Sequence, residues 1–131
     1  MFARTTSGLL ILLMATVGCG DTGRPDTATW LSKWGAVTSA IPEMADLGDP
    51  PDAGLCESAL AAVRAGNEDL LPSPVATVDD LVTEWVAVAQ AAFFDCPPAG
   101  AVIDSFATAY EELERIEETI DSDLSQNEDR P

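Results

Sequence analysis

The stretch TVDDLVTEWVAVAQAAFFDC, which spans residues 77–96, decides the fold of this chain. Its apolar side chains recur at three- and four-residue steps over roughly five turns, which is the period of an amphipathic helix. Thr77 and Asp80 form the Thr-x-x-Asp pattern, in which a hydroxyl and a carboxylate bond to the first free amides of a helix, so the helix should open at Thr77. The apolar positions are Val78, Leu81, Val82, Trp85, Val88, Ala89, Ala92, Phe93 and Cys96.

A second helix is expected immediately before this one, over residues 53–65. Gly66 should end it, because glycine readily takes the left-handed conformation found at helix C-termini. The link that follows, residues 67–74, is rich in turn-forming residues. Two helices joined by a short link pack antiparallel, so these two should form a helical hairpin. The apolar face of the second helix consists of Cys56, Ala59, Leu60 and Val63.

A first helix should begin after Asp26, whose carboxylate can accept hydrogen bonds from the exposed amides of the first turn. Pro42 lacks a backbone donor and disfavours helical geometry at the preceding residue, so the helix should break there and a short turn should run on to Leu47. Trp30 and Trp34 are expected to pack in the core; membrane-interface contact or stacking on a ligand is the alternative. The apolar stripe is formed by Trp30, Leu31, Trp34, Val37, Ile41 and Met44.

A fourth helix is predicted over residues 99–124. Glu117 falls near the centre of its apolar stripe, and we expect the helix to outrun its neighbours so that Glu117 faces water. The alternative is a partly buried carboxylate, a group that often marks a functional site. Acids near the C-terminus oppose the helix dipole and repel one another, so residues 125–131 should form a disordered acidic tail. The stripe contains Ile103, Phe106, Tyr110, Leu113, Ile116, Ile120 and Leu124.

The composition favours an all-α protein, a small antiparallel bundle of about four helices. Aromatic residues are only 6% of the chain, so alanine supplies much of the apolar content, which suits closely packed helices better than a sheet. The 131 residues leave room for one small domain. With 23 acidic and 6 basic residues the chain carries a net charge of −17, which argues against nucleic acid as a partner and against a direct hold on anionic lipid headgroups.

The residue types that most enzyme chemistry needs are missing from the sequence. It contains no histidine, which removes the commonest general base and excludes the usual Ser-His-Asp and Cys-His arrangements. It has neither a glycine-rich phosphate loop nor a GxSxG elbow. The acids of residues 111–123 lack the glycine turn and alternating ligands of an EF-hand loop. We therefore expect no enzymatic activity, no cofactor and no metal site.

The N-terminal residues have the features of an export signal. Arg4 gives a positive start, and the uncharged apolar run over residues 8–17 is shorter than the ~20 residues that span a bilayer. The TVGC motif at residues 16–19 resembles the lipobox of bacterial lipoproteins, in which the cysteine thiol is acylated before cleavage on its amino side. The resemblance implies that Cys19 begins the mature protein and holds it to a membrane by acyl chains. An ordinary secretory signal cut near Gly18 is the alternative.

The other two cysteines are predicted to pair. If Cys19 is acylated, Cys56 and Cys96 remain in an exported protein, where disulfides persist. Antiparallel packing would bring Cys56, near the start of one helix, close to Cys96 at the end of the next. The alternative is a zinc site, but two cysteines in a chain without histidine supply too few ligands. The sequence therefore predicts a disulfide-linked bundle.

The chain is expected to divide into a signal peptide (1–18), a lipidated cysteine with a short tether (19–26), a helical bundle (27–124) and the acidic tail (125–131). Such a protein would lie on the cell membrane or outer membrane, facing the periplasm or the exterior, with a non-enzymatic interaction or structural role carried by its acidic helical surface. One alternative is an inhibitor or immunity lipoprotein for a basic envelope enzyme. The other is a lipoprotein that binds a small ligand in an apolar pocket lined by Trp30, Trp34, Trp85 and Tyr110.

Overall fold

The computed structural model describes residues 23–48, 51–94 and 103–130. All regular secondary structure within these ranges is helical, which confirms the prediction of an all-α protein. Within these described ranges, no helix is both long enough and apolar enough to cross a membrane. The helices are α1 (Thr27–Thr38), α2 (Met44–Leu47), α3 (Ala53–Leu70), α4 (Ala76–Phe94) and α5 (Ile103–Glu128).

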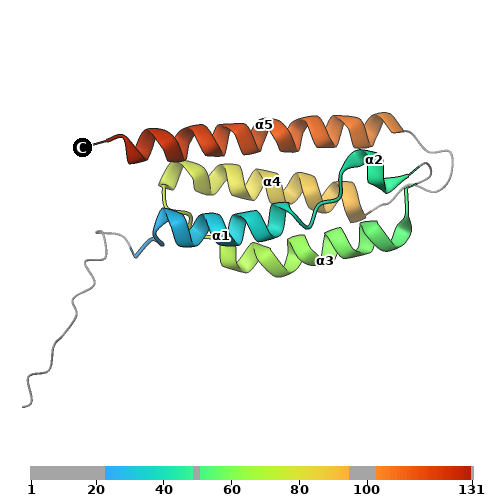
Figure 1. Ribbon diagram of the computed structural model, residues 1–131, viewed down its shortest axis with the longest axis horizontal. Coiled ribbons are helices and arrows are strands. Elements are labelled where there is room, and N and C mark those ends of the chain that lie inside the picture. Colours follow the sequence, from blue (N-terminus) through green and yellow to red (C-terminus); the bar gives the residue numbers. More distant parts are fainter. Residues whose placement is uncertain (1–22, 49–50, 95–102, 131) are drawn as a thin grey trace, which may run out of the picture.

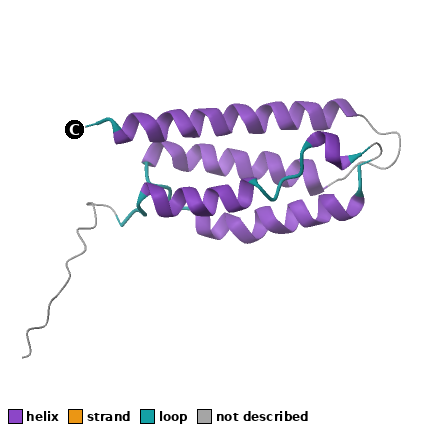
Figure 2. Ribbon diagram, in the orientation of Figure 1, coloured by secondary structure: helices purple, strands orange, loops and turns teal. Residues whose placement is uncertain are grey.

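The four longer helices lie side by side and alternate in direction along the chain (Figure 1; Figure 2). α4 contacts both α3 and α5, α1 packs against α3, and the short α2 contacts α5. The bundle therefore has two distinct ends. We call the end that holds the start of α1 and the end of α5 the tether end, and the opposite end, where α2 lies, the far end.

The buried side chains form two clusters. The larger one extends from the tether end along α1, α3, α4 and α5 and contains all three tryptophans of the sequence. The smaller one lies at the far end, where α2 and the adjoining ends of α3, α4 and α5 meet. Its buried members are Leu47, Cys56, Ala59, Phe93 and Phe106.

The N-terminal part of the bundle follows the sequence prediction closely. The Asp26 carboxylate accepts a hydrogen bond from the Thr29 amide at 2.9 Å. A hydrogen bond with the Thr29 side chain is the largest cause that lowers the pKa of Asp26, and the bond from the Thr29 amide adds to it. α1 ends before Pro42, and α2 then runs to Leu47, where Gly48 has a φ of 80°. The predicted break and the short helical turn after it are therefore confirmed.

The prediction that Gly66 ends the second helix was wrong, because α3 continues through it to Leu70. Gly66 instead lies where α1 and α3 approach each other closely. A Cβ atom at this position would collide with the buried side chain of Val37 on α1. The glycine therefore permits a close helix contact, which sequence alone does not distinguish from a helix stop.

The start of α4 also differs in detail from the prediction. The helix begins at Ala76, so Thr77 lies inside it and cannot be the capping residue. The carboxylate that bonds to the preceding link belongs to Asp79 and not to Asp80. Its Oδ1 accepts hydrogen bonds from the amide of Ser73 at 2.8 Å and from the hydroxyl of Ser73 at 2.6 Å. A carboxylate therefore accepts from an amide just before the helix, as the predicted pattern requires, but the residues are different and the serine hydroxyl donates to that carboxylate.

The last helix extends beyond its predicted end at Leu124 and stops at Glu128. Leu124 is only 4% exposed and belongs to the larger core cluster, so it fixes the final turns to the bundle. Ser125 also donates from its hydroxyl to the carbonyl of Asp121 at 2.8 Å. Residues 125–128, expected in a disordered tail, are therefore helical. The predicted start of this helix, residues 99–102, lies outside the described residues.

Candidate functional site

The three tryptophans predicted to line a pocket come together in the larger cluster. Trp30 stacks on Trp34 with ring centroids 5.4 Å apart, and Trp34 meets Trp85 in a T-shaped contact at 4.9 Å. Each ring is at most 6% exposed. The Trp30 indole N–H donates to the carbonyl of Leu70, at the end of α3, at 2.8 Å. These rings therefore pack against one another in the core, which was their expected role.

Tyr110, the fourth residue of the predicted pocket, lies apart from the tryptophans and packs against the far-end cluster. Its ring meets Phe93 edge-on at a centroid distance of 6.3 Å. Its hydroxyl donates to the carbonyl of Pro42 at 2.6 Å, which ties α5 to the link between α1 and α2. Burial, with a smaller contribution from the charge of Glu43, raises the pKa of Tyr110 to about 12. Tyr110 is therefore a neutral hydrogen-bond donor at neutral pH.

Glu117 was expected to face water, and this was wrong. It is partly buried, and its Oε1 accepts a hydrogen bond from the Trp85 indole N–H at 2.9 Å. Burial raises the pKa of Glu117 above its ordinary value of 4.5; the indole bond opposes this, and the charges of Asp121 and Glu114 add to it. The alternative of a partly buried carboxylate therefore describes the structure. Glu117 and Tyr110 together line a small pocket of about 130 Å³.

Cys56 lies in the first turn of α3 and is 1% exposed. It shares the far-end cluster with Phe93, which is next to the last residue of α4. Its predicted partner, Cys96, and the predicted acylation site, Cys19, both lie outside the described residues. The disulfide and the lipid attachment therefore stay predictions.

One face of α5 carries a row of exposed carboxylates. Their positions follow one another at helical steps of three, four, three and seven residues, so they lie on one side of the helix. The sequence showed that this helix is acidic, but the structure separates these groups from Glu112 and Glu117, which have partners in the bundle. We call the row the acidic ridge; it consists of Glu111, Glu114, Glu118, Asp121 and Glu128.

Arg115, the only basic residue of α5, is engaged away from the acidic ridge. Its Nη2 lies 2.6 Å from Oε1 of Glu112 on the same helix and 3.1 Å from Oε1 of Glu84 on α4. The hydrogen bond from Arg115 is the main cause that lowers the pKa of Glu112. These pairs are too exposed to add much stability. They direct the guanidinium of Arg115 toward Glu112 and Glu84, although Arg115 is only one helical turn from Glu111 and Glu118 of the ridge.

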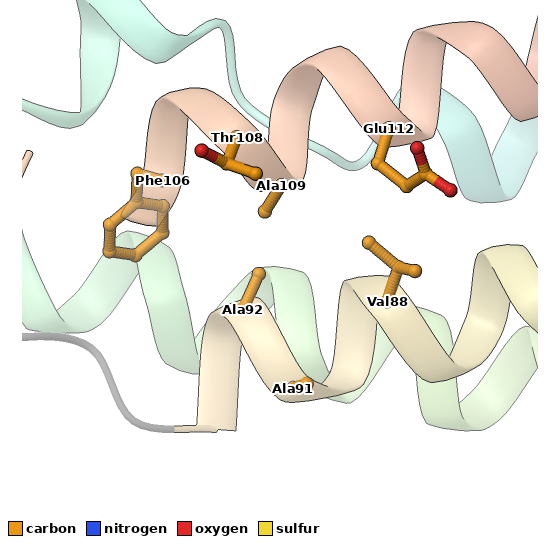
Figure 3. Close-up of a pocket in the computed structure, with 7 residues that line it drawn as sticks. All are labelled: Val88, Ala91, Ala92, Phe106, Thr108, Ala109 and Glu112. Carbon is orange, nitrogen blue, oxygen red and sulfur yellow. The ribbon is translucent and has the colours of Figure 1, made fainter. Parts of the chain in front are cut away.

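A groove of about 460 Å³ lies between α4 and α5 near the far end (Figure 3). Small apolar side chains of both helices line it, and Glu112 lies at one side. Figure 3 shows Ala92 and Val88 of α4 pointing toward Ala109 and Glu112 of α5 across the gap. Because these side chains are short, the two helices leave a shallow apolar surface between them. The lining residues are Val88, Ala91, Ala92, Phe106, Thr108, Ala109 and Glu112.

Arg24 lies within the predicted tether, yet its guanidinium is bound to the bundle. Nη1 lies 2.9 Å from Oδ2 of Asp79 and donates to the carbonyl of Ser73 at 2.9 Å. Burial, the largest single influence on Asp79, favours its neutral form. The hydrogen bonds from Ser73 and the charge of Arg24 together outweigh it, and hold the pKa of Asp79 below its ordinary value of 3.8. We call these three residues the Arg24 clamp.

The Arg24 clamp had no signal in the sequence. Arg24 is separated from Ser73 by 49 residues and from Asp79 by 55 residues, and no periodicity relates them. Turn-forming residues around Arg24 favoured a free segment, which local reasoning could not correct. The clamp is therefore a tertiary feature that fixes the chain just before α1 to the start of α4.

Among the residues that the structure describes, no three histidine, cysteine or carboxylate side chains are grouped so that they could hold a metal ion. No family model, no curated protein and no solved structure matches the chain. The acidic ridge, the groove and the Arg24 clamp are therefore the features from which a function can be inferred.

Proposed function

We propose that this chain is a lipid-anchored protein of the bacterial envelope that binds a basic envelope protein through its acidic ridge and catalyses no reaction. Acyl chains on Cys19 would hold it on the cell membrane or the outer membrane, facing the periplasm or the exterior. This placement is supported by the TVGC motif at residues 16–19, which resembles a lipobox. The net charge of −17 agrees with a covalent anchor, since an acidic protein is not held on anionic headgroups by charge.

The acidic ridge is the observation that carries this proposal. Five exposed carboxylates extend over about 25 Å of a single helix. Like charges at such spacing repel one another and oppose helix formation, so they contribute nothing to the stability of α5. They do create a negative potential along one side of the bundle, which speeds and orients the approach of a cationic partner. A docking surface is the use that this arrangement fits best.

The packing of the aromatic rings supports this proposal over a ligand-binding role. Trp30, Trp34 and Trp85 contact one another in the core, and Tyr110 packs elsewhere. A shared pocket among the four would require them to separate. An inhibitor or immunity protein for a basic enzyme is a narrower form of the same proposal, because it would use the same ridge.

We also propose that a Cys56–Cys96 disulfide closes the far end of the bundle. Two features support it. α3 and α4 pack against each other in opposite directions, and Cys56 is buried beside Phe93, three residues before Cys96 in the sequence. A disulfide requires its two cysteines to lie close together, so these two helix ends must be neighbours. The bond would join α3 to the segment that follows α4.

The docking proposal is tested by capture of envelope proteins on the purified, membrane-derived protein. We expect a basic partner to bind at ~0.05 M salt and to be released at ~0.5 M salt, because the attraction between exposed charges is screened. A ridge variant that combines Glu111→Gln, Glu114→Gln, Glu118→Gln and Asp121→Asn should lose about tenfold or more in affinity for that partner.

A matched control removes the same number of charges elsewhere. It combines Glu57→Gln, Glu68→Gln, Asp69→Asn and Asp80→Asn, which replace exposed acids of α3 and α4. Binding should be kept in this variant, and an equal loss in both would reject the ridge as the docking surface. Mass spectrometry of the same preparation reports the acylation of Cys19, and an unmodified thiol there would reject the anchor.

A further inference from the structure

We infer that the groove between α4 and α5 receives the apolar side of an amphipathic basic helix from the partner protein. This inference rests on the proposed docking function. It adds to that function the place where the partner is held and the kind of segment that binds there. The acidic ridge attracts the segment, and the groove takes up its apolar side chains.

Exposed charges by themselves give only a weak hold on a partner. Ion pairs between exposed side chains stabilise little, and salt screens them. Protein interfaces are held mainly by a few large side chains that fill depressions on the opposite surface. The acidic ridge consists of exposed carboxylates, so a partner that it attracts needs an apolar contact close by.

The groove provides such a contact on the same helix that carries the ridge. Glu112 lines the groove, and Glu111 of the ridge follows about 100° away around α5. Ala91 and Thr108, which also line the groove, are exposed, so the groove is open to solvent. A segment that lies over the outer edge of α5 can therefore reach the groove and the ridge together.

The shape of the groove suits a helix. α4 and α5 run side by side in opposite directions, and three of the residues between them are alanines (Figure 1; Figure 3). Short side chains allow a third helix to pack closely into the depression between two others. Many proteins bind the apolar face of an amphipathic helix in such a groove. The three alanines are Ala91, Ala92 and Ala109.

Charge complementarity determines the polar side of the bound helix. Nη2 of Arg115 lies 2.6 Å from Glu112, in the groove, and 3.1 Å from Glu84. Two carboxylates and one guanidinium leave a net negative charge beside the groove, and the ridge adds further carboxylates on the other side of α5. Basic side chains that flank the apolar ones therefore meet acidic groups on both sides of this helix.

Two synthetic peptides test the groove. Each has about 18 residues, roughly 27 Å as a helix, and the same lysines. One carries leucine along a single helical stripe, and the other carries alanine at those positions. The acylated protein is held in phosphatidylcholine discs, and empty discs give the background. We expect the leucine peptide to bind at least about tenfold more tightly, because it buries more apolar surface. Equal affinities would overturn the inference.

A variant that fills the groove gives a second comparison. Ala91→Gln with Ala109→Gln adds polar bulk without changing the charge, and should reduce the advantage of the leucine peptide to less than about threefold. Ala28→Gln with Ala61→Gln makes the same change at exposed positions on α1 and α3 and should keep the advantage. An unchanged advantage in a groove variant that melts like the wild type would overturn the inference.

A nitroxide on the leucine peptide locates the binding surface on the unaltered protein. The amide signals of Val88, Ala92 and Ala109 should broaden more than those of Ala28 and Ala61, because the groove lies between α4 and α5. Broadening centred on α1 or α3 would place the peptide elsewhere and reject the groove.

The ridge variant distinguishes failure of the groove from failure of the docking function. It should weaken the binding of both peptides and keep the ratio of their affinities. Equal affinities of the two peptides, when both bind more weakly to the ridge variant, would reject the groove and leave the docking function intact. A ridge variant that binds both peptides as the wild type does would overturn the docking function, and the inference with it.

Discussion

Glu117 introduces an acidic group into the contact between α4 and α5, where the Trp85 indole N–H binds it. Because burial raises the pKa of Glu117, the folded protein favours its protonated form. The stability that this preference contributes is fully present below the ordinary pKa of 4.5 and is lost as the pH rises through the raised value. The charged groups that face it, Asp121 and Glu114, are also acidic and act in the same direction.

The Glu117→Gln variant isolates this effect, because the amide still accepts a hydrogen bond from Trp85 but carries no charge. In urea denaturation we expect it to exceed the wild type in stability at pH 7 by less than about 1 kcal/mol, since the site is partly open to water. The difference should disappear near pH 4. Glu117→Ala leaves the indole without its partner and should lose about 1–2 kcal/mol at both pH values. A Gln variant whose advantage does not change with pH would contradict the assignment.

Two glycines allow a second test at the scale of single residues. Alanine is favoured over glycine inside a helix by about 1 kcal/mol. Gly35→Ala should therefore stabilise the protein by about 0.5–1 kcal/mol, because its Cβ atom would meet no atom within 4 Å. Gly66→Ala should instead lower the stability by about 1 kcal/mol or more, because the stiff, buried side chain of Val37 cannot move away from the new methyl group.

Adding Val37→Ala to the Gly66→Ala variant removes the collision and serves as the control. Val37→Ala should then cost less stability in the Gly66→Ala variant than in the wild type. A double-mutant cycle of unfolding free energies measures this difference. Two costs that simply add would show that the close approach of α1 and α3 does not restrict residue 66.

At the scale of elements, the proposed disulfide between α3 and the segment after α4 has a testable effect on stability. A bond between Cys56 and Cys96 would restrict the unfolded chain and add about 2–4 kcal/mol to the stability. Adding a reductant should therefore lower the melting temperature by ten degrees or so, on the order expected for a domain of this size. The Cys56→Ser variant should melt like the reduced wild type and should not respond to the reductant. Equal melting of the oxidised and reduced wild type would exclude the bond.

The helices themselves were largely predictable, because each has a strong local cause. The period of residues 77–96 marks α4, the Asp26 carboxylate marks the start of α1, and Pro42 marks its break. The ends of helices were less predictable where a contact with another helix decides them. α3 continues through Gly66, where α1 packs closely against it. α5 continues past its acidic residues, because Leu124 is buried in the core.

The site residues show the same division between local and tertiary causes. The helical period correctly placed Trp30, Trp34 and Trp85 on core stripes. It could not show that Trp85 lies opposite Glu117, since that depends on how α4 and α5 are aligned. It could not reveal the Arg24 clamp either, which joins distant parts of the chain.

For the whole molecule, charge is the property with the largest predictable effect. The chain carries 23 acidic and 6 basic residues, so mutual repulsion opposes the compact state. Raising the salt concentration from ~0.01 M to ~1 M shortens the Debye length from about 30 Å to about 3 Å and should raise the melting temperature by several degrees. The ridge variant should start from a higher melting temperature and gain less from salt. A melting temperature that salt does not change would contradict a repulsive surface.

Tryptophan fluorescence reports on only one half of the bundle. All three indoles lie in the larger cluster, whereas the far-end cluster contains phenylalanine and the ring of Tyr110 beside it. Tryptophan emission would therefore stay constant if the far end opened locally while the larger cluster remained intact. Circular dichroism in the far ultraviolet follows the helices of both halves. A loss of dichroism before any change in tryptophan emission would show that the two core clusters unfold one after the other.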